Sequence, residues 1–406
     1  MKSRFMFLTL LLPVSLAFLH PAGAAEDKEK DPEKKIKWGG RIQFDGATMS
    51  SDNPAVDAQL LDGTEFRRAR LFASGSFNEW VIFKLQIDFA DSFALTTTDS
   101  GNDVVTTRES PAFKDVFIHF QNLPGVGGIT VGHFKEPFSL EEKTSSKYIT
   151  FMERALPNVF AASRNNGLMF SNEIKDGRMT WAAGVFAETD QDGRSTSNGA
   201  NYVARITGLP WSKGDGKFLH LGLSLSHRKP DEGFINYESR IGTHLAGKLI
   251  NAGGIPADEN NLWDAEVAWV NGRFSAQGEY IASSAETDTS DVDTSGYYAQ
   301  VSIFVTRGDH RTYKNRFGSF GRVHPGNPFE IRKGGSGAVE LALRYSTLDF
   351  SETVLGEEYS NVTFGANWYL NKYTRLVFNA STFEAENPLT GTVDADVYQA
   401  RIQVEF

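Results

Sequence analysis

The chain has 406 residues, a formal net charge of −10, 12% aromatic residues and no cysteine. A negative balance of this size argues against a nucleic-acid partner, and without cysteine no disulfide can stabilise the fold. The length is compatible with one large barrel, whereas stretches with helical periodicity are scarce.

The N-terminus predicts export. Two basic residues, Lys2 and Arg4, precede an apolar stretch over 5–19 and a small-residue sequence, Ala-Gly-Ala, that fits a cleavage site. We expect a signal peptide over 1–24, followed by a charged N-terminal segment over 25–36. A membrane-anchoring helix is the alternative, although the apolar stretch is short for a bilayer crossing.

Alternation of apolar and polar residues begins after this segment and continues to the last residue. Near the start, Ile42 and Phe44 alternate with Arg41 and Gln43. The chain ends in VYQARIQVEF, where Tyr, Ala, Ile, Val and Phe occupy every second position. This two-residue period is that of a β-strand with one apolar face and one polar face.

Two all-β architectures fit the alternation: a soluble β-sandwich and a transmembrane antiparallel β-barrel with a polar lumen. Many candidate strands are about ten residues long, which suits a tilted membrane crossing, and Trp and Tyr stand at strand ends. The polar faces also carry too many charges for a dry core. We therefore predict one domain over 37–406, a barrel of about sixteen strands in the bacterial outer membrane.

The end of the chain suits a closed barrel, because a last strand that pairs with the first leaves no free edge. Its final residue, Phe406, resembles the C-terminal signal that the bacterial barrel-insertion machinery reads. Apart from that machinery, the partners we expect are outer-membrane lipids and small solutes, and no nucleic acid.

The longest gaps between candidate strands lie near 91–112, 135–165, 244–261 and 307–336. The second gap is unusually rich in charged and aromatic residues for a plain connection, and we expect it to fold back into the lumen. Cations that meet at a water-filled constriction form an anion site. Its candidate residues are Lys135, Lys143, Ser146, Lys147, Arg154 and Arg164. The alternative is an extracellular loop whose lysines are merely solvated.

A second group of cations lies in the sequence FRRARLFASGSF. Arg68 and Arg70 share one face of the predicted strand, and arginine at the bilayer centre costs about 2–4 kcal/mol, so we expect both to face the lumen. Arg67 falls on the lipid face unless it sits at a rim, a bulge or a subunit contact. Arginine suits phosphate because its guanidinium donates two parallel hydrogen bonds. The alternative is a set of wall cations paired with Asp88 or Asp115.

The segment FKEPFSLEEKTSSKYITFMER resembles the hallmark loop of the phosphate-selective porins, the O/P family of outer-membrane channels. FRRAR resembles the second strand of that family, and GAVELALRYSTLDF and NWYLNKYTRLVFN resemble its C-terminal strands, so that the similarity covers about residues 36–406. The resemblance implies a trimeric barrel whose third loop is folded inward. It also implies an anion site at these positions: Arg67, Arg68, Asp115, Lys143, Ser146 and Lys147.

The expected function is passive diffusion of small anions, phosphate or related ions, through a water-filled channel, with Arg41 and Lys84 as further pore-lining cations. Because the middle strands offer few cations, a general diffusion channel, or one for sugars or organic acids, is the alternative. A plugged barrel that serves as an adhesin or structural protein is a third hypothesis. The sequence has no zinc-protease motif and no serine-hydrolase motif, so we expect no enzymatic activity, cofactor or metal.

Overall fold

The computed structural model of the chain describes residues 35–90, 95–100, 103–108, 111–195, 199–230, 233–288, 290–332, 334–387 and 391–406. Residues 1–34, which contain the predicted signal peptide and most of the predicted charged segment, lie outside the described part.

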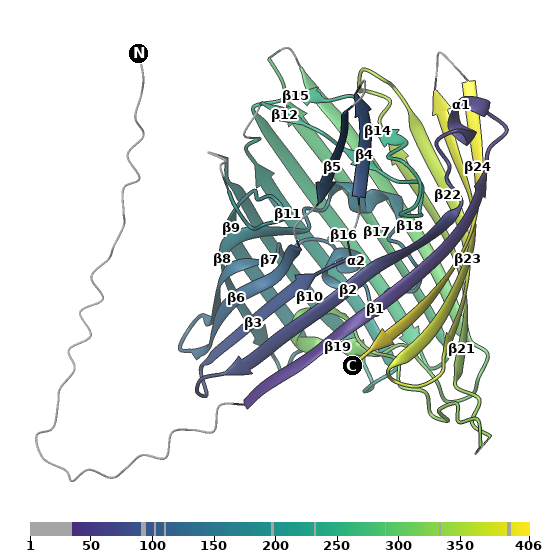
Figure 1. Ribbon diagram of the computed structural model, residues 1–406. Helices are drawn as coiled ribbons and strands as arrows, with labels where there is room; N and C mark the ends of the chain where they lie inside the picture. Colours follow the sequence, from purple (N-terminus) through teal and green to yellow (C-terminus); the bar gives the residue numbers. More distant parts are fainter. Residues whose placement is uncertain are drawn as a thin grey trace, which may run out of the picture. The chain divides into compact units, whose positions relative to one another are not determined.

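Sixteen antiparallel strands of the described chain close into one barrel (Figure 1). Each strand pairs with the next one around the barrel, and the last pairs with the first. The barrel strands are β1 (Lys35–Ser50), β2 (Gly63–Ser76), β3 (Val81–Asp88), β6 (Ala112–Leu123), β7 (Gly127–Lys135), β8 (Arg164–Ile174), β9 (Met179–Ala187), β10 (Asn201–Ser212), β11 (Lys217–Arg228), β16 (Glu259–Asn271), β17 (Phe274–Glu286), β18 (Asp291–Phe304), β21 (Ala338–Asp349), β22 (Glu358–Tyr369), β23 (Thr374–Asn387) and β24 (Gly391–Glu405). The predicted fold class is confirmed.

The first and last strands close the barrel in the predicted way. Ile42 on β1 pairs with Val404 on β24, and the amide of Gly40 donates to the carbonyl oxygen of Phe406 at 2.8 Å. Closure gives the main-chain groups at both edges a partner, which a hydrocarbon surrounding requires.

The barrel places polar side chains inside and apolar side chains outside. On β1, Gln43 is 0% exposed, whereas the neighbouring Ile42 is 43% exposed. On β11, Ser224 is buried and Leu223 is exposed. This arrangement reverses that of a soluble protein, and it is the one that lipid outside and water inside require.

The helices of the described chain are α1 (Pro54–Asp57), α2 (Leu140–Lys143), η2 (Leu156–Phe160) and η3 (Asn315–Phe317). Within the described residues, no helix is long and apolar enough to cross a membrane. The small sheets outside the barrel wall pair β4 (Leu95–Ser100) with β5 (Asp103–Arg108), β12 (Phe234–Ile235) with β15 (Ile255–Pro256), β13 (Glu238–Ser239) with β14 (Ile250–Asn251), and β19 (Tyr313–Lys314) with β20 (Ser319–Phe320).

Connections at the two ends of the barrel differ in length. At the end where β1 begins and β24 stops, six connections have two to four residues. The opposite end carries longer loops, among them 89–111, 136–163 and 229–258. Barrels of this kind place short turns on the periplasmic side, so the barrel end that carries Phe406 is the periplasmic one. The sequence predicted a gap between strands near 244–261, whereas the observed connection between β11 and β16 covers 229–258 and so begins earlier. The pairing of β11 ends there because Pro230 has no N–H with which to continue it.

Three long connections fold into the barrel. We call 136–163 the first, 229–258 the second and 305–337 the third inserted loop. The first two enter from the end with long loops, as predicted for the first. The third corresponds to the predicted gap near 307–336, but it enters from the periplasmic end, which a barrel usually closes with short turns.

The second inserted loop packs an apolar core inside the wall. The ring of Tyr237 lies 4.8 Å from that of Phe160, which belongs to the first inserted loop. Farther along, the side chain of Gln399 on β24 donates to the carbonyl oxygen of Gly242 at 2.9 Å. The second inserted loop therefore crosses the lumen from β11 to β24 and supports the first.

Candidate functional site

One end of the first inserted loop is fixed to β17. The carboxylate of Glu279 accepts hydrogen bonds from the hydroxyl of Ser139 at 3.1 Å, from the amide of Leu140, and from the amide of Glu141 at 3.0 Å. Because this carboxylate takes up the free amides at the start of α2, it holds the short helix in the lumen.

The middle of the same loop is fixed to β23 and β24. Arg375 donates to the carbonyl oxygen of Ile149 at 2.8 Å, and Arg401 donates to that of Met152 at 2.7 Å. Four strands separate β17 from β24 around the barrel, so these anchors stretch the loop across the lumen. The inward-folded constriction loop that the sequence predicted is present.

Arg67 lies in a β-bulge. The pairing of β1 with β2 shifts by one residue between Gln43 and Phe44, and this shift leaves Arg67 outside the regular alternation. Its guanidinium donates to both carboxylate oxygens of Glu153, at 2.8 Å and 3.0 Å. The next residue, Arg68, faces the lumen as predicted and donates to the side-chain oxygen of Gln43 at 2.8 Å. Of the positions left open for Arg67, the bulge is the one adopted.

Glu153 of the first inserted loop forms ion pairs with three arginines. Besides Arg67, it lies 2.9 Å from Arg401 and 3.8 Å from Arg68, while Arg401 also pairs with Asp45 at 2.6 Å. Burial alone would raise the pKa of Glu153, but the three guanidinium charges hold that pKa well below its usual range. We call Glu153 with these three arginines the arginine cluster.

Arg41 and Arg70 are cross-strand neighbours on the lumen face. Arg70 forms an ion pair with Asp88 on β3, one of the two partners that the sequence left open for this group. Arg41 forms no ion pair with a described residue and donates to the hydroxyl of Ser145 at 3.4 Å. Arg70 is therefore neutralised, whereas Arg41 has no carboxylate counter-charge within the described chain.

Asp115 on β6 lies between two of the predicted pore-lining cations. It pairs with Lys84 on β3 and, at 2.8 Å, with Arg164 at the start of β8. Lys84 is the more exposed of the two cations. The structure brings these three predicted residues together, but it uses the carboxylate to neutralise the cations.

Glu142 in α2 neutralises two more predicted cations, Lys135 at 2.7 Å and Arg154 at 3.2 Å. Burial would raise the pKa of Glu142, but Arg154 and Lys135 lower it to about 2. Both cations also donate to the loop backbone, Arg154 to the carbonyl oxygen of Glu141 at 3.1 Å and Lys135 to that of Glu142 itself. Lys135 and Arg154 therefore stabilise the loop rather than line an open site.

Lys143 at the end of α2 is different. Its ammonium group lies 3.5 Å from the carbonyl oxygen of Lys135, and no carboxylate of the described chain lies within 4 Å of it. Burial, together with the positive charges of Arg205 and Arg164, lowers the pKa of Lys143 to about 8, although Asp115 and Glu142 oppose the shift. An anion at Lys143 would therefore meet a cation that lacks a counter-charge.

Lys147 and Ser146 lie at the turn of the loop toward β1 and β24. Lys147 pairs with Glu405 at 2.9 Å, and the carbonyl oxygen of Ser146 accepts a hydrogen bond from Gln43 at 3.3 Å. The predicted site residues therefore do not form one site, and Lys147 shares no contact with the arginine cluster in the described structure.

Two further cations, Lys314 in β19 and Arg322, come from the third inserted loop and were missed in the sequence. With Lys147 they surround the ring of Tyr148, at 4.6 Å for Lys314, 5.1 Å for Lys147 and 5.9 Å for Arg322. Glu405 pairs with Lys147 and Arg322, whereas Lys314 has no carboxylate partner within the described chain. We call these five residues the lysine cluster. The predicted gap near 307–336 is rich in lysine and arginine, and this composition was the signal from which they could have been predicted.

The lysine cluster carries more positive than negative charge. Burial lowers the pKa of Lys314 to about 8, and the neighbouring charges of Lys147 and Arg322 add to the effect. Like charges held this close repel one another unless an anion separates them. The cluster is therefore electrostatically suited to bind a small anion from the water of the lumen.

Three buried carboxylates, Asp264, Glu266 and Glu279, also lie within 4.8 Å of one another. Arg205 already donates to both oxygens of Glu266, each at 2.7 Å, and Glu279 accepts from the start of α2. Protein donors thus occupy the carboxylate oxygens of Glu266 and Glu279, whereas Oδ1 of Asp264 accepts no hydrogen bond within the described chain.

Comparison with known proteins identifies a family and a relative in sequence. The model of the family described as phosphate-selective porin O and P matches residues 36–406. Porin O of Pseudomonas aeruginosa is 28% identical, over 95% of this chain and 91% of that protein.

Two solved outer-membrane structures are similar in fold. The anion-selective porin from Comamonas acidovorans has a TM-score of 0.55 at 14% identity, covering 92% of this chain and 100% of that one. The outer-membrane channel DcaP of Acinetobacter baumannii also has a TM-score of 0.55, at 10% identity, covering 92% of this chain and 97% of that one. At these identities the likeness concerns the barrel fold.

Proposed function

This chain belongs to the phosphate-selective porin O and P family, and we propose that it conducts small anions, with phosphate as the ion it binds best, by passive diffusion across the outer membrane. Membership of that family supports an outer-membrane channel rather than an enzyme. The proposal requires no cofactor and no chemical step.

The excess of positive charge at the lysine cluster carries this proposal. Lys147, Lys314 and Arg322 face one carboxylate, Glu405, where the first and third inserted loops meet. Cations at a narrow, wet place replace part of the hydration shell of an anion, and conduction requires that they release it again. Lysine suits this role because its ammonium is a mobile point charge rather than a rigid fork.

Lys143 and Arg41 add two further cations without an ion-pair partner in the described chain. Both lie in the part of the lumen that the first inserted loop narrows. We place the initial capture of the anion at these residues and at the lysine cluster. The predicted residues Arg67, Lys135 and Arg154 then act by holding the loop, whereas Arg70 pairs with Asp88 within the wall.

A general diffusion channel without a phosphate site is the second candidate function. The neutralisation of most predicted site cations favours it, since Glu153, Asp88, Asp115 and Glu142 each hold at least one of them. In that case the lysine cluster would bias the channel toward anions without binding phosphate.

Three partner assignments accompany the proposal. We infer a homotrimer, as the resemblance to the porins implies. We also infer insertion through the barrel-assembly machinery, for which the exposed Phe406 at the end of the last barrel strand is the recognised feature. Outer-membrane lipids surround the apolar outer face.

The test is ion selectivity in a planar bilayer. The reversal potential in a KCl gradient gives the anion preference, and titration of phosphate against the chloride current gives the binding of phosphate. We expect anion preference with saturable phosphate block, and we expect the double substitution Lys143→Glu and Lys147→Glu to reduce both. Lys213→Glu in an exposed periplasmic turn is the control. Unchanged reversal potentials in the double variant would contradict the assignment, and anion preference without block would favour the second candidate.

A further inference from the structure

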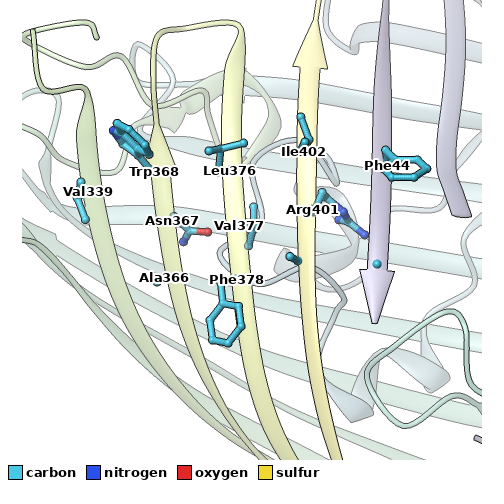
Figure 2. Close-up of a pocket in the computed structure, with 12 residues that line it drawn as sticks. Phe44, Val339, Ala366, Asn367, Trp368, Leu376, Val377, Phe378, Arg401 and Ile402 are labelled. Carbon is cyan, nitrogen blue, oxygen red and sulfur yellow. The ribbon is translucent and has the colours of Figure 1, made fainter. Parts of the chain in front are cut away.

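A groove of about 550 Å³ runs over the outer face of the barrel (Figure 2). It crosses β21, β22, β23, β24 and β1. Its walls and floor are almost entirely apolar, and the strands beneath it turn Arg401 and Asn367 toward the lumen. The groove therefore opens to the membrane and not to the pore.

Cross-strand register explains why the surface is hollow there. One row of outward side chains is bulky: Trp368, Leu376, Ile402 and Phe44 are successive cross-strand partners. These side chains form a ridge on the periplasmic side of the groove (Figure 2).

The next row, two residues farther from the periplasmic end, is mostly small. Ala366, Phe378, Ala400 and Gly46 are successive partners, so one bulky ring stands among three residues with little or no side chain. The step from the bulky row to the small row, about 7 Å along the strands, leaves the hollow.

The groove lies in the periplasmic half of the membrane. Trp368 is next to the last residue of β22, which runs toward the periplasmic end. Its indole N–H donates to the carbonyl oxygen of Ser336 at 2.9 Å, and its ring lies 5.2 Å from that of Phe329. An indole with one apolar face and one hydrogen-bonded edge is typical of the membrane–water interface.

Phe329 and Ser336, the two contacts of Trp368, flank a segment with an exposed apolar side chain next to an exposed cation. Ile331 is 90% exposed. The next residue, Arg332, is also exposed and has no ion pair or hydrogen bond with another described residue. The one carboxylate in this segment, Glu330, has an interaction of its own. This pairing of a free guanidinium with an apolar neighbour suits the headgroup level of a bilayer.

We propose that the groove holds one acyl chain of a phospholipid of the periplasmic leaflet and that the phosphate of that lipid pairs with Arg332. The acyl chain covers the small row between Ala366 and Gly46. Ile331 enters the interface beside the headgroup. The charge of Arg332 favours a phospholipid over an apolar protein surface as the occupant, since a phosphate gives it a counter-charge. The site depends on the outer-membrane location and not on which solute the channel conducts.

Native mass spectrometry of the full-length protein in detergent tests the proposal, with phosphatidylglycerol as the added probe. We expect the wild-type chain to retain one phospholipid at detergent concentrations that remove the rest. Ala400→Phe fills the groove with a side chain that lipid tolerates, and Arg332→Gln removes the phosphate partner. Each substitution should weaken lipid retention about tenfold. Ala265→Phe, outward on β16 and outside the strands that line the groove, and Lys213→Gln are the matched controls and should retain lipid as the wild type does.

Two results would overturn the assignment. Equal retention by Ala400→Phe and wild type would mean that the acyl chain does not occupy this groove. Loss of the oligomer in Ala400→Phe, with lipid retention unchanged, would mean that a second copy of the chain covers it. Neither result bears on the ion selectivity measured in a planar bilayer, so the lipid site and the proposed function fail independently.

Discussion

The arginine cluster and the lysine cluster lie in the same lumen, and both join an inserted loop to the wall, yet their charges are balanced differently. At the arginine cluster, Glu153 and the neighbouring Asp45 together face the three guanidinium groups, so two carboxylates are shared among three cations. In the lysine cluster, one carboxylate, Glu405, serves three cations.

This difference assigns different tasks to the two clusters. Buried ion pairs with good geometry fix a loop in place, and removal of one partner leaves an uncompensated charge. A cluster with excess charge binds its counter-ion from the solution instead. The number of carboxylates around a cation, more than the type of cation, therefore separates an anchor from an anion site.

The largest effect should follow removal of the carboxylate at the centre of the arginine cluster. Glu153→Gln leaves Arg67, Arg68 and Arg401 without their shared partner, and we expect the free energy of unfolding to fall by roughly 3–5 kcal/mol. The midpoint of heat unfolding in detergent, followed by the mobility shift of the folded barrel on gels, measures it. Glu173→Gln on an exposed strand end is the control, and similar midpoints for both variants would mean that the cluster is no anchor.

Removal of the unpaired lysine should change binding rather than stability. Lys314→Gln deletes a cation without a carboxylate partner, so the barrel should stay as stable as the wild type. Phosphate block of the chloride current should weaken about tenfold, which corresponds to the loss of one charged hydrogen bond. A loss of stability with unchanged block would reverse the roles assigned to the two clusters.

Rising pH should weaken the anion preference. Burial lowers the pKa values of Lys143 and Lys314 to about 8 each, so both ammonium groups are charged at pH 6 and neutral at pH 9.5. Reversal potentials in a KCl gradient should therefore lose part of their anion preference between pH 7 and pH 9. Lys143→Arg should flatten part of this profile because arginine keeps its proton. A profile that does not change with pH would show that neither lysine faces the permeating ions.

The same shifts predict the sign of a change in stability. Between about pH 8 and the usual lysine pKa of 10.5, the unfolded chain binds more protons at Lys143 than the folded chain does. Folding stability contributed by this group should therefore rise with pH over that interval. Chemical unfolding at pH 8 and pH 10 measures the difference, with Lys143→Arg as the control that removes it.

The smallest effect should come from a cation whose carboxylate has a second partner. Lys84→Gln leaves Asp115 paired with Arg164, and Lys84 itself is partly exposed. We expect a loss of stability below about 1 kcal/mol and a minor change in reversal potential. A large change in selectivity would move Lys84 from the group of anchors to the anion path.

Much of the fold could be predicted because its signal is local. The alternation of Ile42 with Gln43 depends only on the geometry of a strand, and the side that faces lipid follows from the charges on the other side. The inward course of the first inserted loop could also be predicted, from its length and its density of charges. The bulge at Arg67 could only be left open, because it depends on the register between β1 and β2.

The composition of the site could not be predicted from local signals. Glu153 is 86 residues from Arg67 in sequence, and Lys314 meets Lys147 only because the third inserted loop enters from the periplasmic end. The length of that loop was visible in the sequence, whereas the end of the barrel on which it lies depends on the number of strands before it.

The sequence by itself determined a closed barrel with a polar lumen, since the alternation of apolar and polar residues, kept through the last strand, is a property of neighbouring residues. It also determined which lysines and arginines are present in the loops and on the polar faces of the strands. The tertiary structure alone decided which of those cations remain unpaired. The reason is that an ion pair depends on distances of a few ångströms between side chains far apart in the chain, and these distances are set by the register of the barrel and the course of three inserted loops.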